Sequence, residues 1–180
     1  MALATLAERT AALRALQRSH PARIRAYALS CWMYSLSGAW YLHALPRLPL
    51  ELQATPLMSG TTFGVLLLLQ GLCSYLNDAR LTLGHRVWPG RPFWLCVDRS
   101  LAWVLMCTVV GNAIVWPPCG AHARAVSVAL VATCVVTYPC SKFCEVQGWM
   151  RAFVAWHSVW HYVPNLLAMT WVGLCAYGGE

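Results

Sequence analysis

The sequence predicts an all-α protein, a multi-pass transmembrane helical bundle of about five membrane-spanning helices with an N-terminal amphipathic segment. Two observations support this fold class. Hydrophobic residues make up 59% of the 180-residue chain and charged residues only 11%, which leaves too little polar surface for a soluble domain. The apolar residues also form long continuous runs and do not alternate with period two, so helices are expected and strands are not.

The N-terminal segment differs in composition from the rest of the chain. Residues 1–22 are interpreted as a cytosolic amphipathic segment, and residues 23–180 as a single transmembrane domain. Leu6, Leu13 and Leu16 share one helical face and arginines occupy the others, a pattern typical of a helix that lies on a membrane surface. The alternative is an organellar targeting segment, which is also rich in arginine and poor in acidic residues.

Five apolar stretches are long enough to cross a hydrocarbon core of about 30 Å, which takes about 20 helical residues. We expect these spans at 24–45, 57–77, 93–117, 123–140 and 150–177. Basic residues gather before the first span, between the second and third, and between the fourth and fifth, so the positive-inside rule places the N-terminus in the cytosol. The net charge of +7 then faces anionic lipid, and no nucleic acid partner is expected.

Polar residues of the second and third spans lie toward the cytosolic side. Gln70, Ser74 and Asp78 follow one another at intervals of four, so they share one helix face. Asp98 lies near the start of the third span, about 8 Å along it at a rise of about 1.5 Å per residue. Polar groups in lipid cost free energy unless they meet one another, a metal or water, so we expect them to converge.

The last span carries His157 and His161, which are four residues apart and therefore share a helix face. Two imidazoles at this spacing can bind one metal ion, with a carboxylate as third ligand and water as fourth. Asp78 or Asp98 can supply that carboxylate, the other then acting as general base, with Ser74 positioning the substrate. Zinc is the expected metal, and non-haem iron suits the same ligands. Alternatively, both histidines only make hydrogen bonds within a packed bundle.

The pattern of Ser74, Asp78, Asp98, His157 and His161 resembles that of the CREST superfamily of membrane hydrolases, which includes the alkaline ceramidases and adiponectin-type receptors. The resemblance implies that His157 and His161 are zinc ligands, that Asp98 holds the attacking water and that Ser74 is a catalytic-site serine. It also implies hydrolysis of a lipid amide or a related lipid bond. Members have seven helices, two more than are expected here. Asp78 stands where the family has its third histidine ligand, so it is the expected third metal ligand.

These observations together predict an integral membrane protein with a buried site near the cytosolic face. A zinc-dependent lipid hydrolase is the sharpest expectation for that site, with membrane lipids as partners and one of them as substrate. The alternative is a non-catalytic scaffold, assembly factor or lipid sensor in which the same polar cluster is structural. A haem carrier is disfavoured because histidines four apart on one helix cannot reach both faces of one haem. A transporter is expected to show polar residues through the full membrane thickness.

Overall fold

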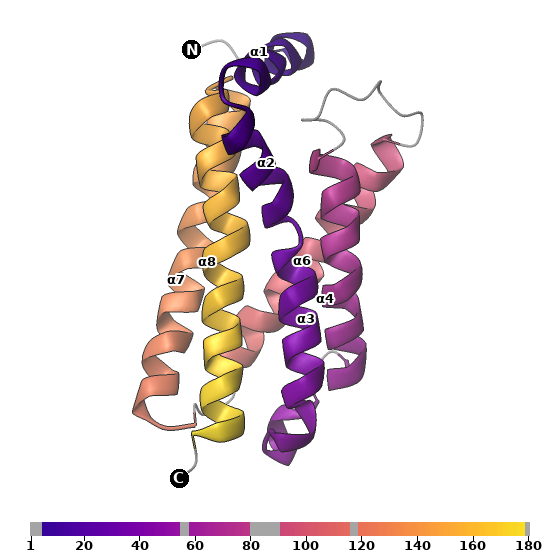
Figure 1. Ribbon diagram of the computed structural model, residues 1–180. Helices are drawn as coiled ribbons and strands as arrows, with labels where there is room; N and C mark the ends of the chain where they lie inside the picture. The colour runs from indigo at the N-terminus through magenta and orange to yellow at the C-terminus, as the bar shows by residue number, and fades with distance from the viewer. Residues whose placement is uncertain (1–4, 55–57, 80–90, 116–118, 179–180) are drawn as a thin grey trace.

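The computed structural model describes residues 5–54, 58–79, 91–115 and 119–178, and these form helices without a strand. The main helices are α1 (Leu6–Ser19), α2 (Pro21–Ser30), α3 (Met33–Ala44), α4 (Gly60–Ser74), α6 (Arg91–Val115), α7 (Ala121–Val146) and α8 (Met150–Tyr177). Two short 3₁₀ helices, η1 (Leu45–Arg47) and η2 (Leu50–Leu52), follow α3, and a π-helix, η3 (Tyr75–Ala79), follows α4. The bundle is elongated, with α7 and α8 side by side on one flank and α4 on the other (Figure 1). The all-α prediction is confirmed.

Helix α1 lies across one end of the bundle (Figure 1) and begins at a capping box. The Glu8 amide donates to the Thr5 hydroxyl at 3.3 Å, and the Thr5 amide donates to the Glu8 carboxylate at 2.7 Å. The bonds from the Thr5 amide and hydroxyl lower the pKa of Glu8. Leu13 and Leu16 are buried in one apolar cluster with Phe153 of α8. The leucine face of α1 is therefore turned toward the bundle.

The first predicted span, 24–45, is two helices and not one. A turn at Cys31 and Trp32 separates α2 from α3, and within it the Trp32 amide donates to the Leu29 carbonyl at 3.1 Å, three residues back. The Ser30 hydroxyl also bonds back to a carbonyl of α2 at 2.6 Å. Such local side-chain bonds compete with regular helix. The turn leaves both Ser30 and Cys31 completely buried.

Helices α3 and α4 pack with their backbones in close approach. A Cβ atom added at Gly38 of α3 would lie 2.7 Å from the Gly64 carbonyl oxygen and 2.8 Å from the Leu68 amide nitrogen. Only glycine fits such an approach, because real Cβ atoms do not lie so near to backbone atoms. This contact fixes α4 against α3 and thereby positions the π-helix that follows α4.

Two helices in the described part of the chain are long and apolar enough to cross a membrane, Phe93–Asn112 within α6 and Ala121–Val146. The five predicted spans are not confirmed. The first is divided, and α4 has only 15 residues before the π-helix. Helix α8 has 28 residues, but it is not one of these two helices. The predicted span ends at 57 and 117 lie outside the described residues.

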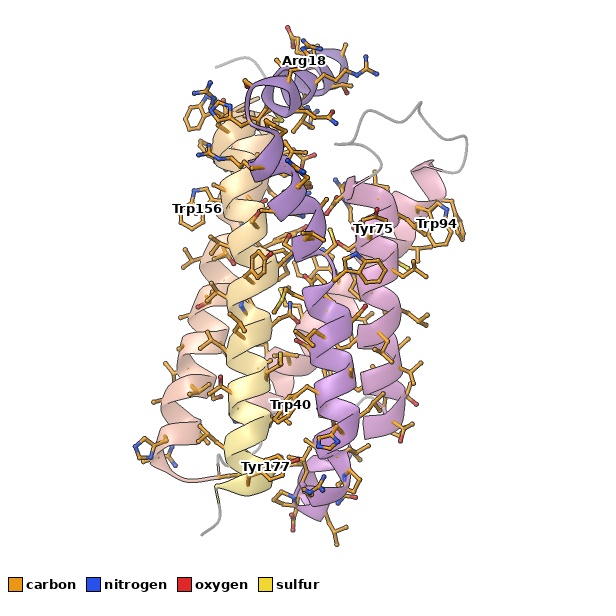
Figure 2. The ribbon with its side chains drawn as sticks, in the orientation of Figure 1. Arg18, Trp40, Tyr75, Trp94, Trp156 and Tyr177 are labelled. Atoms are coloured by element: carbon orange, nitrogen blue, oxygen red, sulfur yellow. The ribbon has the colours of Figure 1, made fainter. Side chains whose placement is uncertain are left out.

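Apolar side chains fill the bundle and also cover its outside. The largest buried cluster includes Tyr41, Phe63, Leu105 and Val172, and it lies toward the end away from α1, where Trp40 and Tyr177 are seen (Figure 2). Among the described residues, large apolar side chains are also exposed on every main helix except α1. Examples, one per helix from α2 to α8, are Leu29, Leu36, Leu69, Val104, Val128 and Leu166.

Candidate functional site

Helix α8 supplies two buried histidines to the α1 half of the bundle. The rings of His157 and His161 lie edge to face with centroids 4.5 Å apart. Each ring is held at Nδ1 by a serine from a different helix: Ser141 of α7 lies 2.9 Å from His157, and Ser30 of α2 lies 2.8 Å from His161. Because Nδ1 is engaged in both rings, the two Nε2 atoms are the ones left for a shared partner.

That shared partner is Asp78, which η3 carries. Its Oδ2 atom lies 3.0 Å from His157 Nε2 and 4.0 Å from His161 Nε2. The carboxylate is 8% exposed, so its contacts to the imidazoles form away from solvent. Ser74, one turn earlier on α4, donates to the same Oδ2 at 3.4 Å. One carboxylate oxygen thus meets two imidazoles and a hydroxyl.

The π-helix brings a second polar residue inward beside Asp78. The Asn77 amide nitrogen lies 3.0 Å from Asp78 Oδ1 and 3.0 Å from Asp98 Oδ2, so it joins the two carboxylates. Gln70 donates to the other Asp98 oxygen at 2.8 Å. Wide π-turns of this kind are frequent at functional sites. Asp98 is therefore oriented by two amides, whereas Asp78 faces the histidines.

Gln70 also presents an unused hydrogen-bond acceptor. Its side chain is only 1% exposed, and its Oε1 atom has no hydrogen-bond partner among the described residues. Because Nε2 is committed to Asp98, the amide orientation is fixed by that bond. A buried acceptor without a donor costs free energy, so Gln70 Oε1 is a place where an N–H or O–H group of a ligand would be favoured.

Cys31 joins this cluster from the turn between α2 and α3. A ligand atom from each of Cys31, Asp78 and His161 lies within 4.8 Å of the other two, and this buried group can hold a metal ion. The sulfur also lies 3.9 Å from the Tyr27 carbonyl, a weak hydrogen bond for a protonated thiol. The continuous apolar span predicted at 24–45 gave no sign of the turn that places Cys31 beside the carboxylate.

The donor atoms that lie close enough for one metal ion belong to Cys31, Asp78 and His161, and this group does not include His157. Two ligands about 2.0–2.2 Å from a tetrahedral zinc ion lie about 3.3–3.6 Å apart. The 4.0 Å between Asp78 Oδ2 and His161 Nε2 is slightly longer than that separation, whereas the 3.0 Å to His157 Nε2 is a hydrogen-bond distance. Metal-bound histidines usually make a hydrogen bond through their other ring nitrogen, and Ser30 and Ser141 make such bonds at Nδ1 here.

A cavity of about 480 Å³ opens beside these residues. The walls include His157, His161, Asp78 and Asp98, together with charged side chains from α1, α6 and α7. Figure 2 shows Tyr75 of η3 and Trp94 of α6 in the same half of the bundle as Arg18. The site and its cavity therefore belong to the α1 half.

All five residues singled out from the sequence lie in this region: Ser74, Asp78, Asp98, His157 and His161 line the cavity. Sequence reasoning left open which carboxylate meets the histidines, and in the structure it is Asp78. Ser30, Cys31, Asn77 and Ser141 were not anticipated. The position of Asn77 next to Asp78 was the one available signal, but in a regular α-helix neighbouring residues do not share a face.

Comparison with known proteins adds no assignment: no protein-family model, curated protein or solved structure matches the chain. The resemblance to the CREST superfamily therefore depends on the spacing of these site residues alone.

Proposed function

We propose that this chain is a membrane-embedded, metal-dependent hydrolase of lipid bonds, with the cluster around Asp78 as its metal centre. The observation that carries the proposal is the buried group of Cys31, Asp78 and His161, whose ligand atoms lie within 4.8 Å of one another, with His157 Nε2 only 3.0 Å from the same carboxylate. Polar groups that only stabilise packing need partners, but they do not need to bring three metal-ligating atoms so close together.

The proposal places the bundle in a bilayer with the α1 end on the cytosolic side. Exposed apolar side chains on six helices support this placement. Exposing such a surface costs free energy in water but not in lipid. The polar groups of Asp78, Asp98 and the histidines are then turned inward to a shared site, as ionisable groups within a membrane usually are. Five membrane crossings follow if α2 and α3 together make the first.

In this proposal His157, His161 and Asp78 hold the metal. A zinc ion held there would supply Lewis acidity to the carbonyl of the scissile bond. Asp98, oriented by Gln70 and Asn77, accepts the proton of the attacking water as general base and then passes it to the nitrogen of the departing amine. Ser74 donates its hydroxyl to the substrate oxygen, since its bond to Asp78 is long at 3.4 Å and easily exchanged.

The orphan acceptor on Gln70 favours an amide among lipid substrates. The N–H of a lipid amide would give Gln70 Oε1 the donor that the protein itself does not provide. An ester has no N–H and would leave this buried oxygen unpaired. Sites built to bind a donor discriminate strongly against analogues that lack one.

Cys31 supports a second candidate function. If the thiolate joins His157, His161 and Asp78, four protein ligands close the metal shell, and closed shells are structural whereas catalytic sites keep one position for water. The protein would then be a non-catalytic scaffold or sensor. The bond from Cys31 to the Tyr27 carbonyl favours a protonated thiol and the open, catalytic site.

Metal content tests the proposal first. The purified protein in detergent is expected to carry about one zinc or iron ion per chain by mass spectrometry, as a single catalytic site requires. A double variant, His157→Ala with His161→Ala, should lose the metal. The matched control is His43→Ala with His122→Ala, which removes two exposed histidines and should retain it.

Hydrolysis tests it second. Release of fatty acid from a long-chain lipid amide should depend on the metal and fall at least about 100-fold in Asp98→Asn, which removes a general base and retains the metal. A protein that holds no metal when purified with care, or whose hydrolysis is unaffected by chelator, contradicts the proposal. Stoichiometric metal without hydrolysis would instead favour the closed structural site.

A further inference from the structure

A second charged group lies in the same cavity, outside the candidate metal centre. Arg9 of α1, Arg99 of α6 and Lys142 of α7 surround a single carboxylate, Glu145 of α7, at 3.7, 3.9 and 2.7 Å. All four side chains line the cavity that contains the histidines. Three positive charges against one negative charge leave this group with a local charge of about +2.

The cationic donors of this group are incompletely used. Lys142 makes a hydrogen bond to Glu145, whereas the two guanidinium groups lie at ion-pair distances beyond hydrogen-bond length. The Arg9 Nε atom is buried and has no hydrogen-bond partner among the described residues. Guanidinium groups with free donors are suited to bidentate binding of phosphate oxygens.

The charged group stands at the open end of the cavity. The side chain of Arg99 is 46% exposed and that of Arg9 28% exposed, whereas His161 is only 2% exposed. A second hollow of about 90 Å³ lies beyond the histidines, toward the apolar end. Tyr34, Met106 and Trp160 line both spaces, and Leu105 and Leu130 are among the apolar walls of the second. A charged opening, a polar centre and an apolar extension therefore follow one another.

We infer that Arg9, Arg99 and Lys142 bind the phosphate of an anionic lipid headgroup, so that the ligand is a phosphate-bearing lipid whose chain runs from the charged opening toward the apolar hollow. The inference rests on the proposed function for its choice of a lipid and names the class of lipid. Phosphate oxygens would take up the Arg9 Nε donor and balance the excess positive charge. The chain would pass the metal centre, which brings a bond near the headgroup to Asp98 and Ser74.

Binding to metal-stripped protein tests the inference without any hydrolysis. Native mass spectrometry measures how tightly the detergent-purified chain binds an N-acylethanolamine phosphate, the N-acylethanolamine with the same acyl chain, and glycerol phosphate. The N-acylethanolamine phosphate should bind at least about tenfold more tightly than either, since one charge-assisted contact alone is worth about that factor. Equal binding of the N-acylethanolamine contradicts a role for phosphate. Equal binding of glycerol phosphate contradicts a lipid and points to a soluble phosphate ester.

A pair of charge-matched variants locates the site. Arg9→Gln with Arg99→Gln should weaken binding of the N-acylethanolamine phosphate at least about tenfold, whereas Arg14→Gln with Arg18→Gln, exposed on the same α1, should change it less than about twofold. Equal effects in the two pairs would overturn the assignment. If the first pair fails to fold, the comparison of lipids on the wild-type protein still decides. A negative result in these binding tests would contradict the phosphate site only. The proposed metal binding and amide hydrolysis are tested separately, by metal content and by release of fatty acid.

Discussion

At the end of the bundle away from α1, Tyr41, Phe63 and Val172 pack in an apolar cluster, and α3 and α4 approach until glycine alone fits between them. In the α1 half, Asp78 of η3 and Asp98 of α6 are buried among amides, hydroxyls and imidazoles. Packing at the apolar end requires only apolar side chains of suitable volume and shape. The polar half needs each partner in place, because every unpaired group is penalised.

This difference shows where function is to be sought. Apolar packing stabilises a bundle without specifying chemistry, whereas a buried network that includes two carboxylates and two histidines adds little net stability over an apolar core. Its presence calls for another reason, and ligand binding is the one that the donor geometry supports. Substitutions at the two ends should therefore separate stability from function.

The largest effect on function is expected at Asp78. Asp78→Ala removes the oxygen on which both histidines converge, so metal content should fall to background and hydrolysis should be lost.

The control at the apolar end is Phe63→Ala, which should lower the free energy of unfolding by about 3–5 kcal/mol. Its metal content per folded chain should stay unchanged. Thermal unfolding in detergent and metal analysis of the folded fraction measure both. Loss of metal in Phe63→Ala would show that the two ends are not separable.

The next effect concerns stability and not function. Adding one methyl group where α3 and α4 approach closely should lower the free energy of unfolding strongly. Gly38→Ala places a Cβ atom 2.7 Å from the Gly64 carbonyl oxygen, so a cost of about 3 kcal/mol or more is expected. The matched control is Gly111→Ala in α6, where nothing lies within 4 Å of the added atom. There the change should stabilise the helix by up to about 1 kcal/mol. Equal thermal unfolding of the two variants would contradict the packing described.

A smaller effect is expected from the serines that hold the histidine rings. Ser141→Ala removes the partner of His157 Nδ1 and should weaken metal affinity by about tenfold. Ser158→Ala is the control on α8, because within the described part of the chain that hydroxyl bonds only to a backbone carbonyl of its own helix, at 2.8 Å. Competition with a chelator of known affinity gives both values. An unchanged affinity in Ser141→Ala would mean that the serine contributes to packing and not to the metal centre.

The smallest effect is expected at Cys31. If the metal shell is open, Cys31→Ser should change metal content and hydrolysis by less than about twofold, since serine retains the hydroxyl donor to Tyr27. A loss of metal as complete as that in Asp78→Ala would make Cys31 a ligand. The catalytic proposal would then give way to a closed structural site.

The helical class and most of the site could be predicted from the sequence because both depend on local periodicity. Residues at intervals of four share a face, so Gln70, Ser74 and Asp78 were expected together, and all three are buried. The convergence of this face with that of His157 followed from the cost of isolated polar groups. Hydropathy could not show the turn at Cys31, because Ser30, Cys31 and Trp32 are compatible with a continuous apolar helix.

The partners across helices could not be predicted in the same way. Ser30 and Ser141 are ordinary residues in their own helices, and only the contact with α8 gives them a role. Likewise Asn77 joins the two carboxylates because the wider turn of η3 carries it inward beside Asp78. These contacts depend on how each helix is rotated about its axis.

The sequence by itself determined that the chain is helical and rich in apolar surface, and that Gln70, Ser74 and Asp78 share one helix face, as His157 and His161 share another. The tertiary structure decided that Asp78 meets the histidines, that Asp98 is held apart by amides, and that Cys31 lies within ligand distance. The physical reason is that the 3.6-residue period fixes a face within one helix, whereas the rotation of one helix against another is set by contacts such as that between Gly38 and Gly64.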